Sequence, residues 1–385
     1  MGLRDVDAAE WDMLAALRRD IHAHPELGFE EERTSGIVRR MLSEVGIEVH
    51  AGLGSAETGR WKKADRTAGR HGCARHAGNG GESPIQIDSA RQDACGHDGH
   101  TVMLLGAARR LAWRRNFSGT VHFVFQPAEE GRGGARAMID GGFFLQFPID
   151  AVYGLHNMPG LAPDEMAVVA GPQLASSDRW SISFEGIGTH GAKPHFGRDA
   201  MTAAGQFLTS LHTIVARRID PLQPAVISAC AIEGGHFEAL NVIPDMVRIG
   251  GTARAFTPAV RDQIEEEIGG QAKGIAALYG ITCDYRYFRQ MPPVFNDADI
   301  AARALKAAQT ALGADRVRTA FAPSTAGDDF AMFSSEVPGA YVWLGNGPAE
   351  DGALHHNSRY DFNDDAIPSG VDFWTTLVEQ ELAKA

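Results

Sequence analysis

Apolar residues at helical spacing dominate the opening of the chain. Between residues 8 and 40 they recur every three or four positions, which is typical of helices with one buried face. The pattern is interrupted at His24-Pro25, because proline disfavours the helical conformation in the residue before it. We therefore predict two helices joined by a turn.

Helical and extended patterns then alternate. Residues 102–113 are rich in Ala, Leu and Arg and predict a helix, whereas residues 120–125 alternate as a strand does. Residues 151–155 and 340–344 are short apolar runs typical of buried strands. Strands that alternate with helices favour the α/β class with an open, mostly parallel sheet.

The middle of the chain predicts a separate unit of different order. Thr257 and Pro258 suit the start of a helix, as a cap and a first-turn residue. The expected order is βαββαβ, a ferredoxin-like α+β unit. We predict a discontinuous metal-binding domain, residues 1–176 and 291–385, with an inserted lid or dimerisation domain, residues 177–290. The expected strands of that inserted domain are 180–184, 225–232, 247–256 and 281–287, and its first helix is 199–217.

One segment, residues 54–93, departs from this pattern. Between residues 51 and 93 the only aliphatic residues beyond alanine are Leu53, Ile85 and Ile87. Glycine, arginine, histidine and serine crowd the remainder, so the segment cannot supply a buried strand.

Composition narrows the class of protein. With 385 residues, 44% hydrophobic and 22% charged, the chain suits a soluble protein of two domains. A formal net charge of -13 disfavours nucleic acid and anionic membranes as partners. No signal peptide or long apolar run is evident, so we expect a cytoplasmic protein. Four cysteines are too few and too scattered for a disulfide framework.

Candidate metal ligands gather in residues 94–100, Ala-Cys-Gly-His-Asp-Gly-His. Cys95 and His97 place a thiol and an imidazole on one small loop, and glycines let a backbone approach a metal closely. The alternative is a buried thiol beside surface histidines. A second alternative makes Cys95 the nucleophile of a cysteine hydrolase with His97 as its base.

Two adjacent carboxylates, Glu129 and Glu130, follow the strand expected at residues 120–125. Open α/β sheets bind ligands at the carboxyl ends of their strands. One glutamate could therefore ligate a metal while the other serves as a general base. A solvated acidic turn is the alternative.

His156 follows the strand expected at residues 151–155, and His355 lies near the end of the chain. A single histidine is more often structural. Together with the thiol and the carboxylates, however, these imidazoles form a donor set suited to zinc or manganese.

These motifs together resemble one family, the hippurate hydrolases, N-acyl-amino-acid amidohydrolases and auxin-conjugate hydrolases, which are related to aminoacylase and carboxypeptidase G. The resemblance covers most of the chain. The motifs that carry it are residues 18–27, 95–100, 127–131, 154–159, 188–195, 241–244, 327–331 and 354–357.

The resemblance implies a two-metal site. Cys95 would bridge two divalent cations, and Glu129 would act as the general base. The remaining ligands would be His97, Glu130, His156 and His355. Manganese, zinc, cobalt or nickel would suit these donors.

In the inserted domain the resemblance implies that His190 stabilises the developing oxyanion, either within its own subunit or across a dimer interface. Asn241 and Arg254 would hold the substrate, since a guanidinium can pair with the carboxylate of an amino acid. A loop histidine and a surface arginine are the structural alternatives. A homodimer or homotetramer is expected.

The implied activity is metal-dependent hydrolysis of the amide bond in N-acyl or N-aroyl amino acids. A dipeptidase or carboxypeptidase is the runner-up. Members of the family carry an Arg-Ala-Asp-Met-Asp-Ala-Leu-Pro motif that this chain lacks, which favours a third possibility, an inactive metal-binding pseudoenzyme. We hypothesise that residues 54–80 derive from a foreign reading frame or a deletion.

Overall fold

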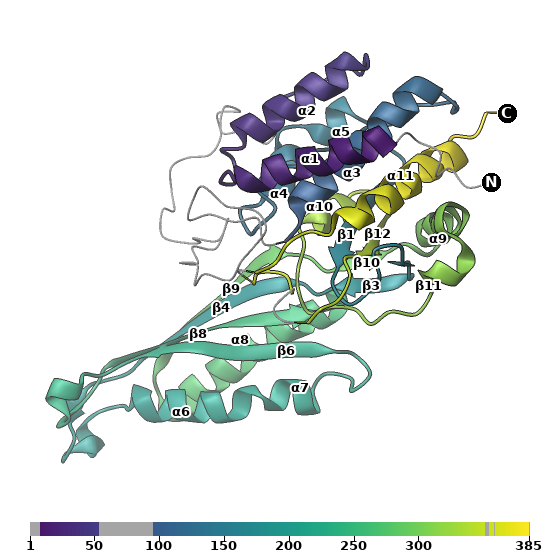
Figure 1. Cartoon of the computed structure of the whole chain (residues 1–385). Helices are drawn as coiled ribbons and strands as arrows, with labels where there is room; N and C mark the ends of the chain where they lie inside the picture. Colours follow the sequence, from purple (N-terminus) through teal and green to yellow (C-terminus); the bar gives the residue numbers. More distant parts are fainter. Residues whose placement is uncertain (1–7, 54–94, 351–353, 358, 385) are drawn as a thin grey trace. The chain divides into compact units, whose positions relative to one another are not determined.

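The computed structural model describes residues 8–53, 95–350, 354–357 and 359–384 (Figure 1). The chain divides into two compact units. Unit 1 comprises Met1–Gly171, Asn296–Ala322 and Met332–Ala385, and unit 2 comprises Pro172–Phe295 and Pro323–Ala331. The atypical segment 54–93 lies outside the described residues. The lid or dimerisation role of the inserted part stays a prediction.

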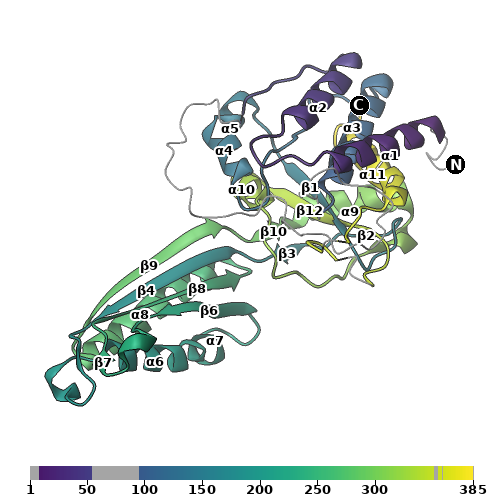
Figure 2. The same cartoon turned by 60° about the vertical axis from the view of Figure 1, so that its left-hand side comes forward.

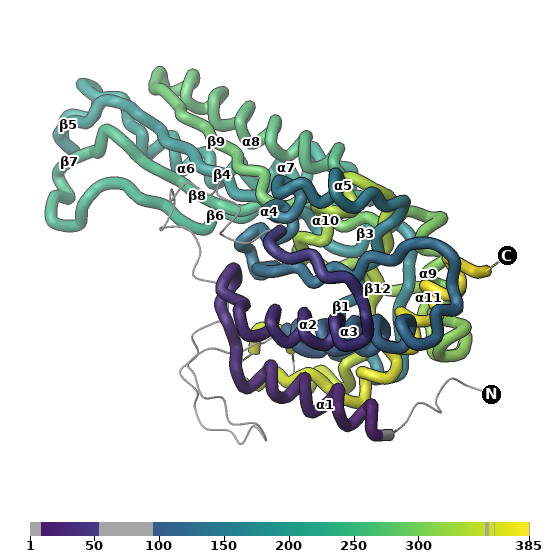
Figure 3. The backbone as a smooth tube through the Cα atoms, turned by 90° about the horizontal axis from the view of Figure 1, so that it is seen from above, coloured from purple at the N-terminus to yellow at the C-terminus, as the bar shows by residue number. Residues whose placement is uncertain are grey.

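The helices expected at the start of unit 1 are confirmed. α1 (Ala8–Ala23) and α2 (Glu32–Glu44) are separated by the turn that contains Pro25. α3 (His97–Arg114) begins earlier than the apolar pattern predicted, at His97 itself. Figure 3 shows α1, α2 and α3 side by side. The shorter helices α4 (Gly134–Asp140) and α5 (Phe143–Gln146) follow.

A four-stranded sheet forms the centre of unit 1, and its two expected strands are confirmed as β1 (Val152–Met158) and β12 (Gly339–Gly345). The order is β1-β12-β2-β11, with β2 at Met166–Ala167 and β11 at Val317–Arg318. β1 pairs with β12 in parallel, as β2 does with β11, while β12 and β2 are antiparallel. The unit therefore has an α/β fold with a mixed sheet.

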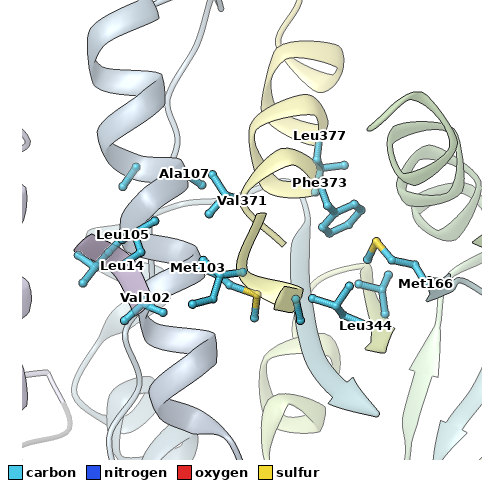
Figure 4. Packing of buried hydrophobic residues seen from close by; sticks show 14 of the residues in the cluster. Leu14, Val102, Met103, Leu105, Ala107, Met166, Leu344, Val371, Phe373 and Leu377 are labelled. Carbon is cyan, nitrogen blue, oxygen red and sulfur yellow. The ribbon is translucent and has the colours of Figure 1, made fainter. Parts of the chain in front are cut away.

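Side chains of the sheet alternate between two hydrophobic clusters, as the pleat requires. Tyr153 and Leu155 pack against the larger cluster, which includes residues of α3, α9 (Ala298–Leu312) and α11 (Ile367–Glu381). Figure 4 shows Leu14, Met103 and Val371 meeting in this cluster. Val152 instead packs against a smaller cluster around Ala135, Met138, Phe143 and Phe333. Helices thus cover both faces of the sheet.

The strand expected at residues 120–125 is not formed as a strand in the described part of the chain. Its side chains nevertheless alternate, since Phe123 and Phe125 pack against the larger cluster and Val124 packs against the smaller one. The alternation of side chains between two faces, which the sequence predicts, is therefore present. A strand also needs a paired neighbour to satisfy its backbone groups, and none of the described segments supplies one here.

Unit 2 has the predicted βαββαβ order, with a four-stranded antiparallel sheet in the order β6-β8-β4-β9 (Figure 2). Its two long helices, α6 and α8, pack on the sheet through a hydrophobic cluster that includes Trp180, Phe184 and Phe207. No described helix of either unit is long and apolar enough to span a membrane. The elements are β4 (Ser177–Glu185), α6 (Ala200–Leu211), α7 (Thr213–Arg217), β6 (Ala225–Glu233), β8 (Met246–Ala255), α8 (Pro258–Tyr279) and β9 (Thr282–Met291). Two small sheets pair β5 (Thr189–His190) with β7 (Val242–Ile243) and β3 (Gly171–Leu174) with β10 (Val294–Asn296).

A buried ion pair lies within unit 2. The side chain of Asp178 is fully buried and accepts two hydrogen bonds from Arg261, at 2.8 and 2.6 Å. Tyr287 donates its hydroxyl to the same carboxylate at 3.0 Å. Burial, reinforced by the charge of Asp178, raises the pKa of Tyr287, so this hydroxyl remains a donor. Removing the carboxylate would leave a buried guanidinium without its counter-charge.

We predict that Asp178→Asn destabilises the protein by about 3–5 kcal/mol, the usual cost of breaking a buried ion pair on one side. The matched control is Glu233→Gln, which removes the carboxylate of the exposed pair with Arg248 and should cost less than about 1 kcal/mol. Urea denaturation of both variants would measure the difference. Equal shifts of the two midpoints would contradict the prediction.

Candidate metal centre

The loop that starts α3 carries the thiol and the first imidazole of the site. Cys95 is buried, and Gly96 adopts a left-handed conformation with φ of 92° as the N-cap of α3. A Cβ atom on Gly96 would lie 2.0 Å from Nδ2 of Asn157 and 2.5 Å from the hydroxyl of Tyr360. Close packing against protein atoms is therefore sufficient to require glycine at this position. The sequence also predicts that the glycine allows close approach to a metal, and that role stays a prediction.

Three predicted ligands meet at this loop. Sγ of Cys95 lies 3.4 Å from Nε2 of His156, which lies within β1, two residues before the strand ends at Met158. Donor atoms of Cys95, His97 and His156 all lie within 4.8 Å of one another. These residues come from two separate elements, α3 with its preceding loop and β1, so the fold itself brings them together.

The two carboxylates lie beside the same loop. Oε2 of Glu129 is 3.5 Å from Nε2 of His97, and donor atoms of His97, Glu129 and Glu130 lie within 4.8 Å of one another. Both glutamates are partly buried. The structure therefore groups five of the predicted residues, His97, Cys95, His156, Glu129 and Glu130.

The structure brings His356, rather than the predicted His355, to this group. Nε2 of His356 lies 3.9 Å from Sγ of Cys95 and 3.8 Å from Oε1 of Glu130. Cys95, Glu130 and His356 form a second set of donors within 4.8 Å of one another. His355 instead directs its Nε2 to Oδ1 of Asn157. The two adjacent imidazoles point differently because they lie on a turn, and His356 has a left-handed φ of 62°.

The donor spacing fits divalent metal ions. Two ligands of one tetrahedral zinc lie about 3.4–3.6 Å apart, because Zn–S is about 2.3 Å and Zn–N about 2.0–2.1 Å. The measured separations of 3.4 and 3.9 Å from the thiol to His156 and His356 are close to these values. Cys95 belongs to both ligand sets. A thiolate shared in this way can bridge two cations.

A buried ionic network, which was not predicted from the sequence, holds the loop that carries Cys95 and His97. The carboxylate of Asp98 is fully buried and lies 2.9 Å from Nδ1 of His22 and 3.5 Å from Arg18. Arg18 also pairs with Asp361 at 2.6 Å and Asp364 at 2.7 Å. These residues hold the start of α3 against α1 and the C-terminal segment. In the sequence, residues 18–27 served only as one of the motifs that carry the family resemblance.

His100 and Asn157 are two further residues whose part in the site was missed. Burial, with a smaller contribution from His156, lowers the pKa of His100 well below its ordinary value. The neutral ring accepts a hydrogen bond from the backbone N–H of Asn157 at 3.0 Å. The side chain of Asn157 donates to the carbonyl of Cys95 at 2.9 Å. Together they tie the end of β1 to the Cys95 loop.

His190 and Asn241 lie together in unit 2. His190 on β5 is paired with Val242 on β7, and the N–H of Gly191 donates to the carbonyl of Asn241 at 2.7 Å. Nδ1 of His190 accepts the backbone N–H of Ala192 at 3.1 Å. A neutral ring with this bond carries its proton on Nε2, so the exposed nitrogen is a donor.

Arg254 lies elsewhere in unit 2, near the C-terminal end of β8, where it is paired with Val226. Its guanidinium donates to the carbonyl of Ala253 at 2.9 Å. Asn241 precedes the opposite end of this strand, which starts at Met246. Arg254 is eight positions along the strand from Met246, or roughly 26 Å at about 3.3 Å per residue. The structure therefore does not bring Arg254 to His190 and Asn241 within one copy of unit 2.

Comparison with known proteins finds relatives that match nearly the whole chain. The chain is 34% identical to the N-acetylcysteine deacetylase of Bacillus subtilis, over 96% of this chain and 97% of that protein. It is 35% identical to the hippurate hydrolase of Campylobacter jejuni, over 94% of each.

A solved structure and a family model extend the likeness. A dinuclear metal-binding peptidase of the M20 family from Bacillus subtilis matches with a TM-score of 0.80 and 29% identity, covering 98% of this chain and 99% of that one. Residues 79–380 match the model of peptidase family M20/M25/M40. Since the family match spans most of the chain and both relatives align over nearly their full length, this protein belongs to peptidase family M20/M25/M40.

Proposed function

We propose that this chain is a two-metal amidohydrolase that cleaves the amide bond of N-acyl or N-aroyl amino acids. The observation that carries the proposal is the pair of donor sets that share Cys95, with Glu129 beside them. Membership in an amidohydrolase family supports it, as do the printed activities of the two relatives, which concern hippurate and N-acetylcysteine.

The residues that would hold the cations are Cys95, His97, His156, Glu130 and His356. Thiolate, imidazole and carboxylate together suit zinc, manganese, cobalt or nickel. When bound, such cations supply Lewis acidity that lowers the pKa of water and polarises an amide carbonyl. A fully buried Asp98 and a neutral His100 fix the orientation of the loop that carries the first two donors.

Glu129 would handle the proton. Its carboxylate faces the donor cluster, 3.5 Å from His97, and its neighbour Glu130 belongs to the ligand sets. A carboxylate in this place can accept a proton from the attacking water and return it to the departing amine nitrogen. The carbonyl carbon then carries the new bond to oxygen, and the bond to nitrogen is broken.

The residues of unit 2 are assigned to substrate recognition in the same proposal. The donor on Nε2 of His190 suits a developing oxyanion, while Asn241 and Arg254 suit the polar groups of the amino-acid half. A homodimer would let two copies contribute to one site. Cytoplasmic location remains an expectation from the sequence.

Three alternatives keep the same residues but change the activity. A dipeptidase or carboxypeptidase would also cleave a secondary amide, and comparing hippurate, N-acetyl amino acids and dipeptides as substrates would identify it. A cysteine hydrolase would use Cys95 as nucleophile, and its activity would survive exhaustive chelation by EDTA. A pseudoenzyme would bind metal and turn over none of these amides.

We predict that Glu129→Gln lowers kcat on hippurate or an N-acetyl amino acid by about 10²–10⁴-fold, the usual contribution of a general base. Metal content should stay at the wild-type level, because Glu130 still supplies a ligand. Steady-state kinetics and elemental analysis would measure both. Unchanged kcat would remove Glu129 from the mechanism.

A second prediction separates the two adjacent histidines. His356→Ala should reduce the metal content or weaken metal binding about tenfold or more, because it removes a donor near both Cys95 and Glu130. His355→Ala serves as the matched control and should retain more metal, since that ring contacts Asn157. Elemental analysis of both variants decides between them. Loss of metal from the His355 variant alone would restore the original assignment.

A further inference from the structure

The glutamate pair is carried by a loop with an unfavourable backbone conformation. Ala128, immediately before Glu129, has a left-handed φ of 55°. This conformation raises the free energy of a residue that has a Cβ atom by roughly 1–2 kcal/mol. A turn follows in which the N–H of Gly131 donates to the carbonyl of Glu129 at 2.6 Å. Something outside the loop must therefore hold Ala128 in place.

The carboxylate of Glu31 contacts this residue directly. Oε1 of Glu31 accepts the backbone N–H of Ala128 at 2.9 Å, although the two residues are 97 positions apart. The backbone N–H of Phe29, which is itself left-handed with a φ of 67°, also lowers the pKa of this carboxylate. One half-buried carboxylate thus binds the amide of Ala128 and interacts with that of Phe29, and both residues have left-handed backbones.

A second bond joins the same two segments in the opposite direction. The guanidinium of Arg132 donates to the carbonyl of Gly28 at 3.0 Å. A Cβ atom on Gly28 would lie 3.0 Å from Cβ and 3.1 Å from Cα of Ala128, so the segments touch at this point. The turn at residues 26–31 and the loop at residues 126–134 are therefore packed as one piece.

Hydrogen bonds also anchor the turn at residues 26–31 to α1 and α2. The two oxygens of Glu26 accept the N–H groups of Arg33 and Thr34, at 2.7 and 2.8 Å, in the first turn of α2. The side chain of Arg33 donates to both oxygens of Asp20 on α1, at 2.9 and 2.7 Å. A continuous series of bonds thus runs from two helices of the core to the residue before Glu129.

We infer that Glu31 is a positioning residue of the metal centre, which fixes Glu129 and Glu130 by holding the left-handed Ala128. This inference rests on the proposed function for its effect on metal and turnover. Immobilisation of the loop at residues 126–134 by Glu31 does not depend on the proposed function, because it rests on the contacts of Glu31. Burial raises the pKa of Glu31 and the three backbone donors, its own N–H and those of Ala128 and Phe29, oppose that rise, as expected of a carboxylate that serves as an acceptor.

The test compares Glu31→Ala and Glu31→Gln with the matched control Glu30→Gln, an exposed neighbour. Hydrogen exchange, followed by mass spectrometry on chelated protein, reports on the peptide covering residues 126–134. We expect exchange there to be roughly tenfold or more faster in Glu31→Ala, because a hydrogen bond to a charged acceptor is lost. The glutamine variant, which keeps one acceptor oxygen, should lie between the alanine variant and the wild type.

Cobalt titration and kinetics on hippurate give the second readout. We expect Glu31→Ala to bind cobalt about tenfold to a hundredfold more weakly, with a lower kcat and a nearly unchanged KM. Adding Ala128→Gly to this variant should restore part of the affinity, since glycine adopts the left-handed conformation without penalty. A purely structural role of Glu31 would show no such rescue.

Two results would overturn the inference. One is wild-type exchange of residues 126–134 in both Glu31 variants, and the other is wild-type cobalt affinity and kcat in the same variants. Failure of the proposed function looks different. In that case wild-type protein itself would bind no cobalt, while the exchange of the loop would still respond to Glu31.

Discussion

The parallel pairing of β1 with β12 is the constraint on which the metal centre depends. Parallel neighbours end at the same edge of a sheet, and here that edge receives His156 directly from β1. The segment after β12 returns to the same edge with His356. Because α3 starts beside β1, Cys95, which precedes α3, lies close to both imidazoles. The pairing of β1 with β12 therefore places His156 and His356 at one edge of the sheet, beside Cys95.

Hydrogen bonds and buried charges turn this convergence into a defined geometry. Asn157 joins the end of β1 to the carbonyl of Cys95, while Asp98 joins the same loop to Arg18 and His22. Buried charges of this kind are retained only when they are paired, because desolvation of an isolated charge is costly. The donors are thereby oriented before any cation arrives, which reduces the conformational entropy lost on binding.

Much of the fold and part of the centre could be predicted from the sequence. Apolar runs identified β1 and β12, and the structure places His156 of β1 close to Cys95 and His97, while its role as a metal ligand stays a prediction. His355 and His356 could not be separated, because hydrophobic periodicity says nothing about which of two neighbours on a turn approaches the thiol of Cys95. Contacts such as Glu31 with Ala128 join residues 97 positions apart, and their geometry arises only when the chain is packed. Residues 120–125 show the opposite case. Their side chains alternate between the two clusters as predicted, but the segment forms no strand hydrogen bonds within the described part of the chain.

The length of β8 sets a limit on how unit 2 can serve a small substrate. Arg254 lies near one end of β8, roughly 26 Å along the strand from Met246, whereas Asn241, which contacts Gly191 beside His190, precedes the other end. A single acylated amino acid is much shorter than this strand. If both groups recognise the same molecule, they must belong to different chains. Turnover per chain would then decline on dilution, because separated subunits could no longer combine Arg254 of one chain with His190 and Asn241 of another.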